Sequence, residues 1–319
     1  HQFRSYNPEL GDGRGFLFAQ CIDPVDERLL DFGTKGSGKT PWSRGGDGRL
    51  TLKGGVREVL ASEMLEALGV YTSKSFALVE TGEQLWRGDE PSPTRSAVLT
   101  RLSHSHIRIG TFQRLVYLEQ TSALASLLDY AIAHYYPAIA QGTTEQRAAQ
   151  FLGEVTVNVA RTGARWIAAG FVHGVLNTDN INITGESFDY GPWRFLPSYD
   201  PLFVAAYFDE TGLYAFGRQP DALAWNLTRL AECLVPLSRI DLLEPEVNRF
   251  WPAFKTALAD AILDRLGLSR GTPEQDEAFI ATLYDVLGDL RPAYEQFFFD
   301  WRGGRLGLER AQASPQGDI

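Results

Sequence analysis

The sequence predicts an α+β protein of one domain with two lobes, a β-rich lobe over residues 1–115 and a helical lobe over residues 116–319. Three observations support this architecture. Short β-favouring segments separated by Gly and other turn residues fill the first third of the chain. Long segments with apolar residues at helical spacing fill the rest. At 319 residues the chain is long enough to bury a substantial core within one large domain.

The first lobe is expected to contain several short strands and one helix. The expected strands are 15–19, 49–52, 75–79, 84–86 and 97–100. The expected helix is 56–68, and Gly69 directly after it provides the stop. Its apolar residues recur every four positions and predict the buried stripe, namely Val56, Leu60, Met64 and Leu68. Glu58 and Glu66 lie off that stripe and are expected on other faces of the helix.

The second lobe is expected to be mainly helical, with a catalytic and metal-binding loop over residues 173–191. The expected helices are 123–136, 144–170, 220–235, 244–266 and 273–298. The last of them begins with the sequence Thr272-Pro-Glu-Gln275, which provides an N-cap residue, a Pro at the first helical position and a capping-box Gln.

Composition excludes several classes of protein. A hydrophobic content of 44% with 22% charged residues is typical of a soluble globular protein, and no run is long enough to span a membrane. The net charge of −10 argues against a nucleic-acid partner. Cys21 and Cys233 are too few for a disulfide framework and favour a reducing compartment, although a single bridge stays open. We expect a cytoplasmic location in a bacterium, or a mitochondrial one in a eukaryote.

The most informative motif is His173-Gly-Val-Leu-Asn-Thr-Asp-Asn180, followed nine residues later by Asp189-Tyr-Gly191. In protein kinases an Asn and an Asp-aromatic-Gly hold the Mg²⁺ that bridges ATP phosphates. The segment 181–188 has two β-favouring pieces around a Gly, which predicts a hairpin that brings Asn180 and Asp189 together. The motif therefore predicts a metal site, with an ordinary Asn- and Asp-rich turn as the alternative.

The same motif lacks the kinase base. The kinase loop reads His-Arg-Asp-x-x-x-x-Asn, and counting back from Asn180 places Val175 at the Asp position. Valine cannot accept a proton, whereas Asp179 provides a new carboxylate beside Asn180. Together with the order of the two lobes, the motif predicts a protein-kinase-like fold whose nucleotide site serves different chemistry.

Other residues are candidates for binding the phosphates. Lys35 and Glu58, the latter on the one helix of the first lobe, predict the Lys–Glu pair that a kinase needs. The Gly-rich segment 11–15 is suited to covering phosphates with backbone N–H groups. Arg101 and Arg108 are suited to gripping a triphosphate through forked hydrogen bonds.

A Walker A pattern is the strongest alternative. Residues 33–40 read GTKGSGKT, and such a loop needs a buried strand before it and a helix directly after it. Residues 29–32 read as a poor buried strand, and the glycines in 45–48 would break a helix. We therefore expect Lys35, and not Lys39, to contact the phosphates.

Several longer motifs are similar to those of one known family. They are Lys35–Arg49 (KGSGKTPWSRGGDGR), Ser105–Arg108 (SHIR), His173–Asn180 (HGVLNTDN), Asp189–Pro192 (DYGP) and Tyr199–Pro201 (YDP). From residue 1 to about residue 236, the chain thus resembles the selenoprotein O family. The resemblance implies a kinase-like protein adenylyltransferase, which moves AMP from ATP to Ser, Thr or Tyr hydroxyls of proteins and releases pyrophosphate.

The resemblance also implies roles for single residues. ATP would bind in a flipped orientation with Mg²⁺ or Mn²⁺. Asp179 corresponds to the base, Asn180 and Asp189 to the metal ligands, and Glu58 to the partner of Lys35. The implied nucleotide contacts are Gly11, Gly13, Arg14, Lys35, Asp47, Gly48, Arg101, Arg108 and Asp189.

The chain departs from the family pattern at its ends. It begins at His1 without the region that precedes this residue in the family, and its C-terminal tail is short, so we expect a chain shortened at both ends. Two other functions stay open: a catalytically inactive ATP-binding scaffold, because Val175 replaces the kinase base, and ordinary phosphotransfer.

Overall fold

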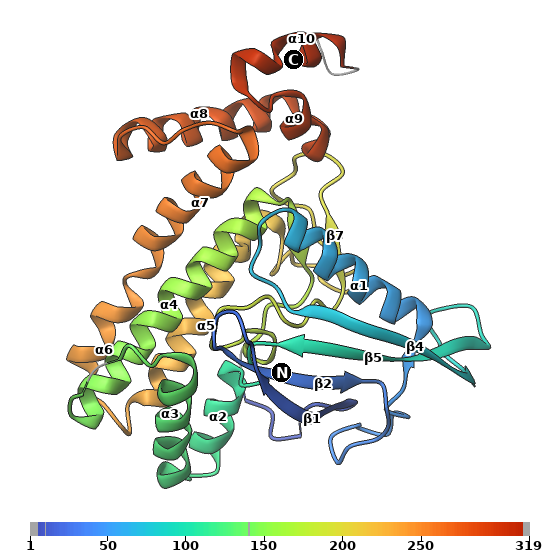
Figure 1. Cartoon of the computed structure of the whole chain (residues 1–319), viewed down its shortest axis with the longest axis vertical. Coiled ribbons are helices and arrows are strands. Elements are labelled where there is room, and N and C mark those ends of the chain that lie inside the picture. The colour runs from blue at the N-terminus through green and yellow to red at the C-terminus, as the bar shows by residue number, and fades with distance from the viewer. Residues whose placement is uncertain (1–5, 10, 140, 315–319) are drawn as a thin grey trace.

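An antiparallel sheet is built from the first hundred residues of the protein, as a computed structural model shows (Figure 1). The structure describes residues 6–9, 11–139 and 141–314. Strand β5 pairs with β2, β3 and β4, and β1 extends the sheet beyond β2. The strands are β1 Gly15–Ile22, β2 Leu29–Lys35, β3 Leu50–Thr51, β4 Lys74–Leu85 and β5 Thr94–Ser103. Strand β4 joins the two segments that were predicted as the separate strands 75–79 and 84–86.

The prediction that residues 29–32 form a poor strand was wrong, because they belong to β2, which lies between β1 and β5. Asp31, the residue that weakened the pattern, is buried. Its carboxylate accepts hydrogen bonds from the His106 backbone N–H at 2.9 Å and from the Gln20 amide at 2.7 Å. Burying a polar group costs little when its hydrogen bonds are made, so a strand tolerates this Asp in its interior.

Helix α1 (Leu52–Ala67) packs against the sheet with a different face from the predicted one. Its buried residues are Gly55, Glu58, Ala61, Ser62 and Leu65. The predicted apolar stripe is wrong, since Val56 and Leu60 are 43% and 56% exposed. Glu58 decides the rotation of the helix, because its carboxylate meets Lys35 and Arg101 from the sheet.

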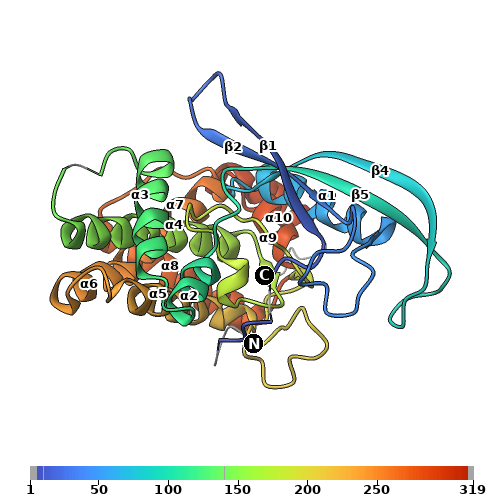
Figure 2. The same ribbon diagram turned by 90° about the horizontal axis from the view of Figure 1, so that it is seen from below.

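The helical part of the chain begins after β5 and is arranged around the long helix α4. Figure 2 shows the strands on one side of the molecule and helices α2 to α6 on the other. The helices are α2 Ile109–Tyr117, α3 Thr121–Tyr135, α4 Thr144–Ala168, α5 Gln219–Leu234, α6 Ile240–Val247, α7 Phe250–Leu266, α8 Pro273–Leu290, α9 Tyr294–Asp300 and α10 Leu308–Ala313. Within the described residues, none has both the length and the apolar character needed to cross a membrane.

Two predicted long helices are each divided in the structure. The predicted helix 244–266 corresponds to the end of α6 and to α7, with Pro252 in the first turn of α7. The predicted helix 273–298 is divided at Arg291, whose φ of 45° is left-handed, and at Pro292. Proline removes a backbone donor and disfavours a helical residue before it, so both divisions follow from local sequence.

The segment between α4 and α5 carries the kinase-like motif and contains little regular structure. Its elements are β6 Phe171–His173, the 3₁₀ turn η1 Thr178–Asn180, β7 Trp193–Phe195 and the 3₁₀ turn η2 Phe216–Arg218. A last 3₁₀ turn, η3 Gly304–Gly307, precedes α10. The hairpin predicted over 181–188 is wrong, because this segment bridges to other parts of the chain: Asn182 pairs with Arg108, and Ser187 pairs with Thr72. The segment therefore attaches the helical part to the sheet.

The two cysteines are not bridged. Cys21 on β1 is partly buried and Cys233 on α5 is buried, and both are free thiols.

Candidate active site

A cavity of about 1170 Å³ opens between the sheet with α1 and the segment that carries the kinase-like motif. It exceeds the usual range for small-molecule sites, about 300–1,000 Å³. Every residue assigned a site role from the sequence contributes to its lining: Gly11, Gly13, Arg14, Lys35, Asp47, Gly48, Glu58, Arg101, Arg108, Asp179, Asn180 and Asp189. Residues spread over almost 180 positions thus meet at one place.

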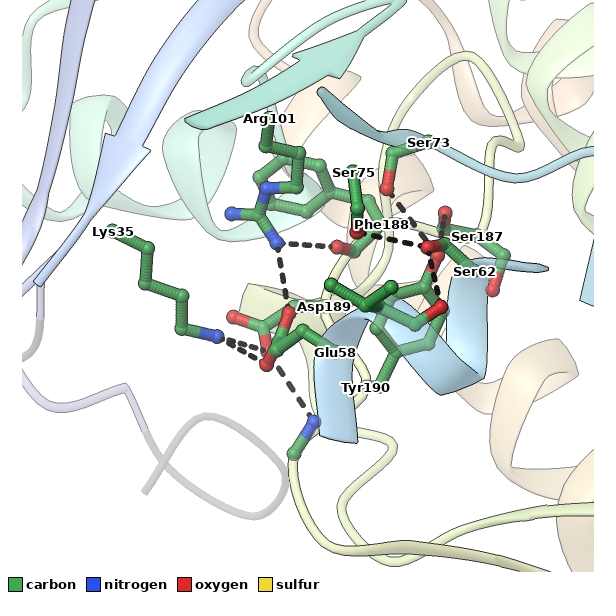
Figure 3. A network of polar contacts seen from close by, with 12 residues as sticks. Lys35, Glu58, Ser62, Ser73, Ser75, Arg101, Ser187, Phe188, Asp189 and Tyr190 are labelled. Carbon is green, nitrogen blue, oxygen red and sulfur yellow. Dashed lines mark hydrogen bonds and ion pairs between the residues drawn. The ribbon is translucent and has the colours of Figure 1, made fainter. Parts of the chain in front are cut away.

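One wall of the cavity is formed by Lys35, Glu58 and Arg101, which we call the Lys35 cluster (Figure 3). The Lys35 ammonium lies 2.7 Å from one carboxylate oxygen of Glu58, and Arg101 Nη1 lies 3.5 Å from the other. All three residues are more than nine-tenths buried. In the sheet register Arg101 lies opposite Gly33, two residues from Lys35, and Lys35 lies opposite Leu99. Because side chains alternate along a strand, Lys35 and Arg101 project from the same face of the sheet.

Asp189, from the segment that carries the kinase-like motif, completes this wall. Its Oδ1 is 3.4 Å from the Lys35 ammonium. Burial alone would raise the pKa of Asp189, but the charges of Lys35, Arg101 and Arg108 outweigh it and hold that pKa well below its ordinary value. Asp189 is therefore ionised at neutral pH and is a strong oxygen donor.

The position of Asp189 is fixed by a buried histidine. Burial lowers the pKa of His173, so the ring is neutral. Its Nδ1 accepts the Val175 backbone N–H at 3.1 Å, which leaves the proton on Nε2. Nε2 donates to the backbone carbonyl of Asp189 at 2.5 Å. His173 thus organises the loop, because both of its ring nitrogens are engaged with backbone groups.

A second part of the lining, here called the second wall, carries Asp179 and Asn180 on the turn η1. Burial raises the pKa of Asp179 to about 6, against the lowering effect of the Arg108 charge. The Asn180 side-chain amide donates to the Val175 carbonyl at 2.8 Å, which leaves its Oδ1 as the atom available to a cation. Val175 itself lines the cavity and provides no proton acceptor there.

The donor set fits a divalent cation that is shared with phosphates. Among the residues that the structure describes, no group of three or more His, Cys, Asp or Glu side chains could hold a metal without other ligands. Asn180 and Asp189 provide two oxygen donors on the same cavity. Mg²⁺ is commonly bound by one or two carboxylates together with substrate phosphates and water, so such a partial set is sufficient.

The Gly-rich segment is held over the cavity by its neighbours. The Asp12 carboxylate accepts the backbone N–H of Gly15 at 2.6 Å and lies 2.8 Å from Arg108. Thr40 and Ser43 donate to the backbone carbonyls of Asp12 and Gly13 at 2.6 and 2.5 Å. The end of the Walker-like pattern and the residues directly after it thus support the Gly-rich loop, and no helix begins there to bind phosphate by its N-terminus.

The geometry of a P-loop is missing from residues 33–48. Turns and bends, and no helix, follow Lys39 in this region, and Lys39 is exposed and outside the cavity lining. Gly48 has a φ of 70°, and a Cβ there would lie 2.1 Å from the Gly38 carbonyl oxygen. Only glycine fits this turn, so the glycines serve a tight loop.

Several lining residues were missed in the sequence. Arg57 donates to the Trp193 carbonyl at 2.8 Å and lies 4.6 Å from the centre of its indole ring. Arg87 holds both carboxylate oxygens of Asp47, at 2.8 and 3.0 Å, so this predicted nucleotide contact is already ion-paired. Phe208 lines the cavity from a loop. These contacts join segments that are distant in the sequence, and neither the periodicity nor a single motif predicts such contacts.

The chain is similar to known proteins along most of its length. The family model described as protein adenylyltransferase SelO matches residues 1–305. Proteins named protein nucleotidyltransferase YdiU are similar along the chain. The relative from Synechocystis is 50% identical over 95% of this chain and 64% of its own length. The relative from Gloeobacter violaceus is 49% identical over 100% of this chain and 65% of its own length.

The likeness extends to more distant bacteria. The relative from Azotobacter vinelandii is 41% identical over 93% of this chain and 60% of its own length. The chain thus spans somewhat less than two thirds of the length of these relatives. Since the family model covers nearly all of the residues, the chain belongs to the SelO family.

Proposed function

We propose that this chain is a two-lobed, protein-kinase-like enzyme that transfers AMP from ATP to protein hydroxyls. The lobes would be residues 1–115 and 116–319, with the site in the cavity between them. The observation that supports the proposal best is that two differently built walls line one cavity. The Lys35 cluster offers buried positive charge, and Asp179 offers a carboxylate where the kinase base position is occupied by Val175.

ATP is the substrate that suits the charge of the cavity. Lys35, Arg101 and Arg108 concentrate positive charge in a protein whose net charge is −10. Charged hydrogen bonds from lysine and arginine are the usual means of binding phosphates. Asn180 and Asp189 would hold Mg²⁺ or Mn²⁺, and a cation bound there supplies neutralisation of phosphate charge.

The reaction needs an attack on the α-phosphorus. The oxygen of a Ser, Thr or Tyr hydroxyl forms a bond to the α-phosphorus, the bond from that phosphorus to the bridging oxygen breaks, and pyrophosphate leaves. Asp179 accepts the hydroxyl proton. Its raised pKa of about 6 leaves it mostly ionised at neutral pH and makes it a stronger base than an ordinary Asp. Lys35, Arg101 and Arg108 stabilise the charge of the departing pyrophosphate.

The bacterial sources of the relatives and the two free thiols support a location in the bacterial cytoplasm.

Two other functions compete with this proposal. Phosphotransfer would need a proton acceptor near the γ-phosphate, and Val175 cannot provide one. A scaffold would bind ATP without using Asp179.

The test uses two samples of ATP, one labelled at the α-phosphate and one at the γ-phosphate. The purified chain with Mg²⁺ is incubated with each, and with a mixture of bacterial proteins, and incorporation is followed on a gel. AMP transfer predicts label in protein from the α position alone. Incorporation of the γ label would show a kinase, and binding of ATP with neither label incorporated would show a scaffold.

A further inference from the structure

Helix α2 lies against the turn that carries Asp179 and Asn180. The backbone N–H of Ile109 donates to the carbonyl of Ile181 at 3.1 Å, and that of Ile183 donates to the carbonyl of Ile107 at 3.1 Å. The chain directly after the turn is thereby fixed to the beginning of α2. The helix is in turn anchored in the core by Ile109 and Phe112, both fully buried.

Gly110, in the first turn of α2, makes room for the Asp179 carboxylate. A Cβ at this position would lie 2.5 Å from Asp179 Oδ1 and 3.5 Å from its Cγ. The first distance is closer than non-bonded carbon and oxygen atoms approach. Glycine is also a poor helix former, so a buried glycine in a helix needs a packing reason. The neighbouring carboxylate supplies that reason.

Gln113, three residues after Gly110 on the same face of α2, is hydrogen-bonded to the turn η1. Its side-chain oxygen accepts the hydroxyl proton of Thr178 at 2.5 Å. Thr178 is fully buried and directly precedes Asp179. Residues three apart on a helix lie on one face, so Gly110 and Gln113 act on the turn together.

We propose that Gly110 and Gln113 are positioning residues for AMP transfer, which fix where the Asp179 carboxylate lies. Neither residue lines the cavity, so both act through the turn. The inference rests on the proposed role of Asp179 as the base. It separates the two tasks of the site, because Gly110 and Gln113 act on the turn that carries Asp179, whereas an ATP phosphate would need the Lys35 cluster.

Two substitutions test the proposal. Gly110→Ala introduces a methyl group against the end of a side chain that is able to turn away, so the fold survives and the carboxylate moves. Thr178→Val removes the hydroxyl and keeps the shape. Misplacing a catalytic group by about 1 Å costs on the order of 10²-fold, so we expect kcat for α-label transfer to fall by about that factor. We expect KM for ATP and the thermal midpoint to stay close to those of the unmodified chain.

Each variant has a matched control. Gly288→Ala makes the same change in α8, where the nearest atom to a new Cβ is 4.0 Å away, on Tyr199. Thr178→Ser keeps the hydroxyl that Gln113 accepts. Both controls should retain kcat, and recovery in Thr178→Ser would show that the hydrogen bond matters.

Three outcomes overturn the inference. The first is a Gly110→Ala variant with unchanged kcat. The second is a loss of kcat that comes with an equal fold-loss of ATP affinity or with a clear fall of the thermal midpoint. Asp179→Asn is measured beside them. If Asp179→Asn keeps full transfer, the proposed base is wrong and the positioning role falls with it. If Asp179→Asn is inactive and Gly110→Ala is fully active, the positioning inference alone is wrong.

Discussion

The two walls of the cavity are built on different physical principles. The Lys35 cluster is a set of buried charges, joined at 2.7 and 3.5 Å. The turn η1 is held by hydrogen bonds to Val175, Gln113 and the start of α2, and its Asp179 has a pKa raised to about 6. The first wall is suited to binding an anion, and the second is suited to exchanging a proton.

This difference predicts what substitutions in each wall do to stability and activity. A buried ion pair costs much when one partner is removed, because the remaining charge has lost its compensation. A turn held by neutral hydrogen bonds loses less, since each bond contributes only about 0.5–1.5 kcal/mol. Substitutions in the Lys35 cluster should therefore affect stability and ATP binding, whereas those at the turn should affect the rate of transfer.

The largest effect on stability is expected from Glu58→Ala. This change leaves Lys35 and Arg101 buried with less negative charge beside them, and breaking a buried pair costs about 3–5 kcal/mol. Urea unfolding measures the loss, with the exposed Glu63→Ala on the same helix as a control. A loss below about 1 kcal/mol, the value of an exposed pair, would show that the cluster is not the rigid element described above.

The next effect concerns ATP affinity and the two lysines of the Walker-like pattern. A hydrogen bond to a charged group contributes about 1.5–3 kcal/mol, so Lys35→Ala should weaken ATP binding by one to two orders of magnitude. Lys39→Ala should leave it unchanged, because Lys39 is exposed and outside the cavity. Calorimetric titration with ATP and Mg²⁺ compares the two, and the reverse order of effects would restore the P-loop interpretation.

A third expected effect is a dependence of stability on pH, at the point where the helical part attaches to the sheet. Burial raises the pKa of Glu186 to about 8, and its carboxylate accepts the His104 backbone N–H at 3.0 Å. Between its ordinary value of about 4.5 and about 8, the folded chain keeps a proton that the unfolded chain has lost. Its contribution to stability therefore falls as pH rises, by about 1.4 kcal/mol per pH unit.

Glu186→Gln should remove this slope. The neighbouring His104, whose pKa burial lowers to about 4, is neutral in the folded protein over this range, and the slope that its unfolded ring adds near pH 6.5 is common to both chains. Urea unfolding between pH 6.5 and 8 should show the original chain losing stability more steeply than Glu186→Gln. Parallel curves would mean that Glu186 is ionised in the folded protein.

The sequence predicted which residues meet at the cavity better than it predicted the packing around them. Asn180 and Asp189 lie in one short motif, and the chemistry of ATP sites restricts what such a motif can do. The exposed Val56 and Leu60 show where periodicity failed, because the ion pairs of Glu58 outweigh the burial of an apolar stripe. Propensity does not register a tertiary ion pair of this kind.

The hairpin over 181–188 failed for a related reason. Its β-favouring residues do extend, but they pair with Thr72 and Arg108 and not with each other. The same holds for Gly110, whose packing against Asp179 links residues 69 positions apart. Contacts between distant segments leave no periodic trace in a single sequence, so they appear only in the folded chain.

The most direct test of this account is the Asp179→Asn variant, measured for ATP affinity and for pyrophosphate release in one preparation. Removing a general base costs about 10²–10⁴-fold in rate. We therefore expect release of pyrophosphate to slow by that factor, while the Kd for ATP with Mg²⁺ stays the same because the Lys35 cluster is intact. An unchanged rate of release, or a loss of ATP binding equal to the loss of rate, would contradict the division of binding and proton transfer between the two walls.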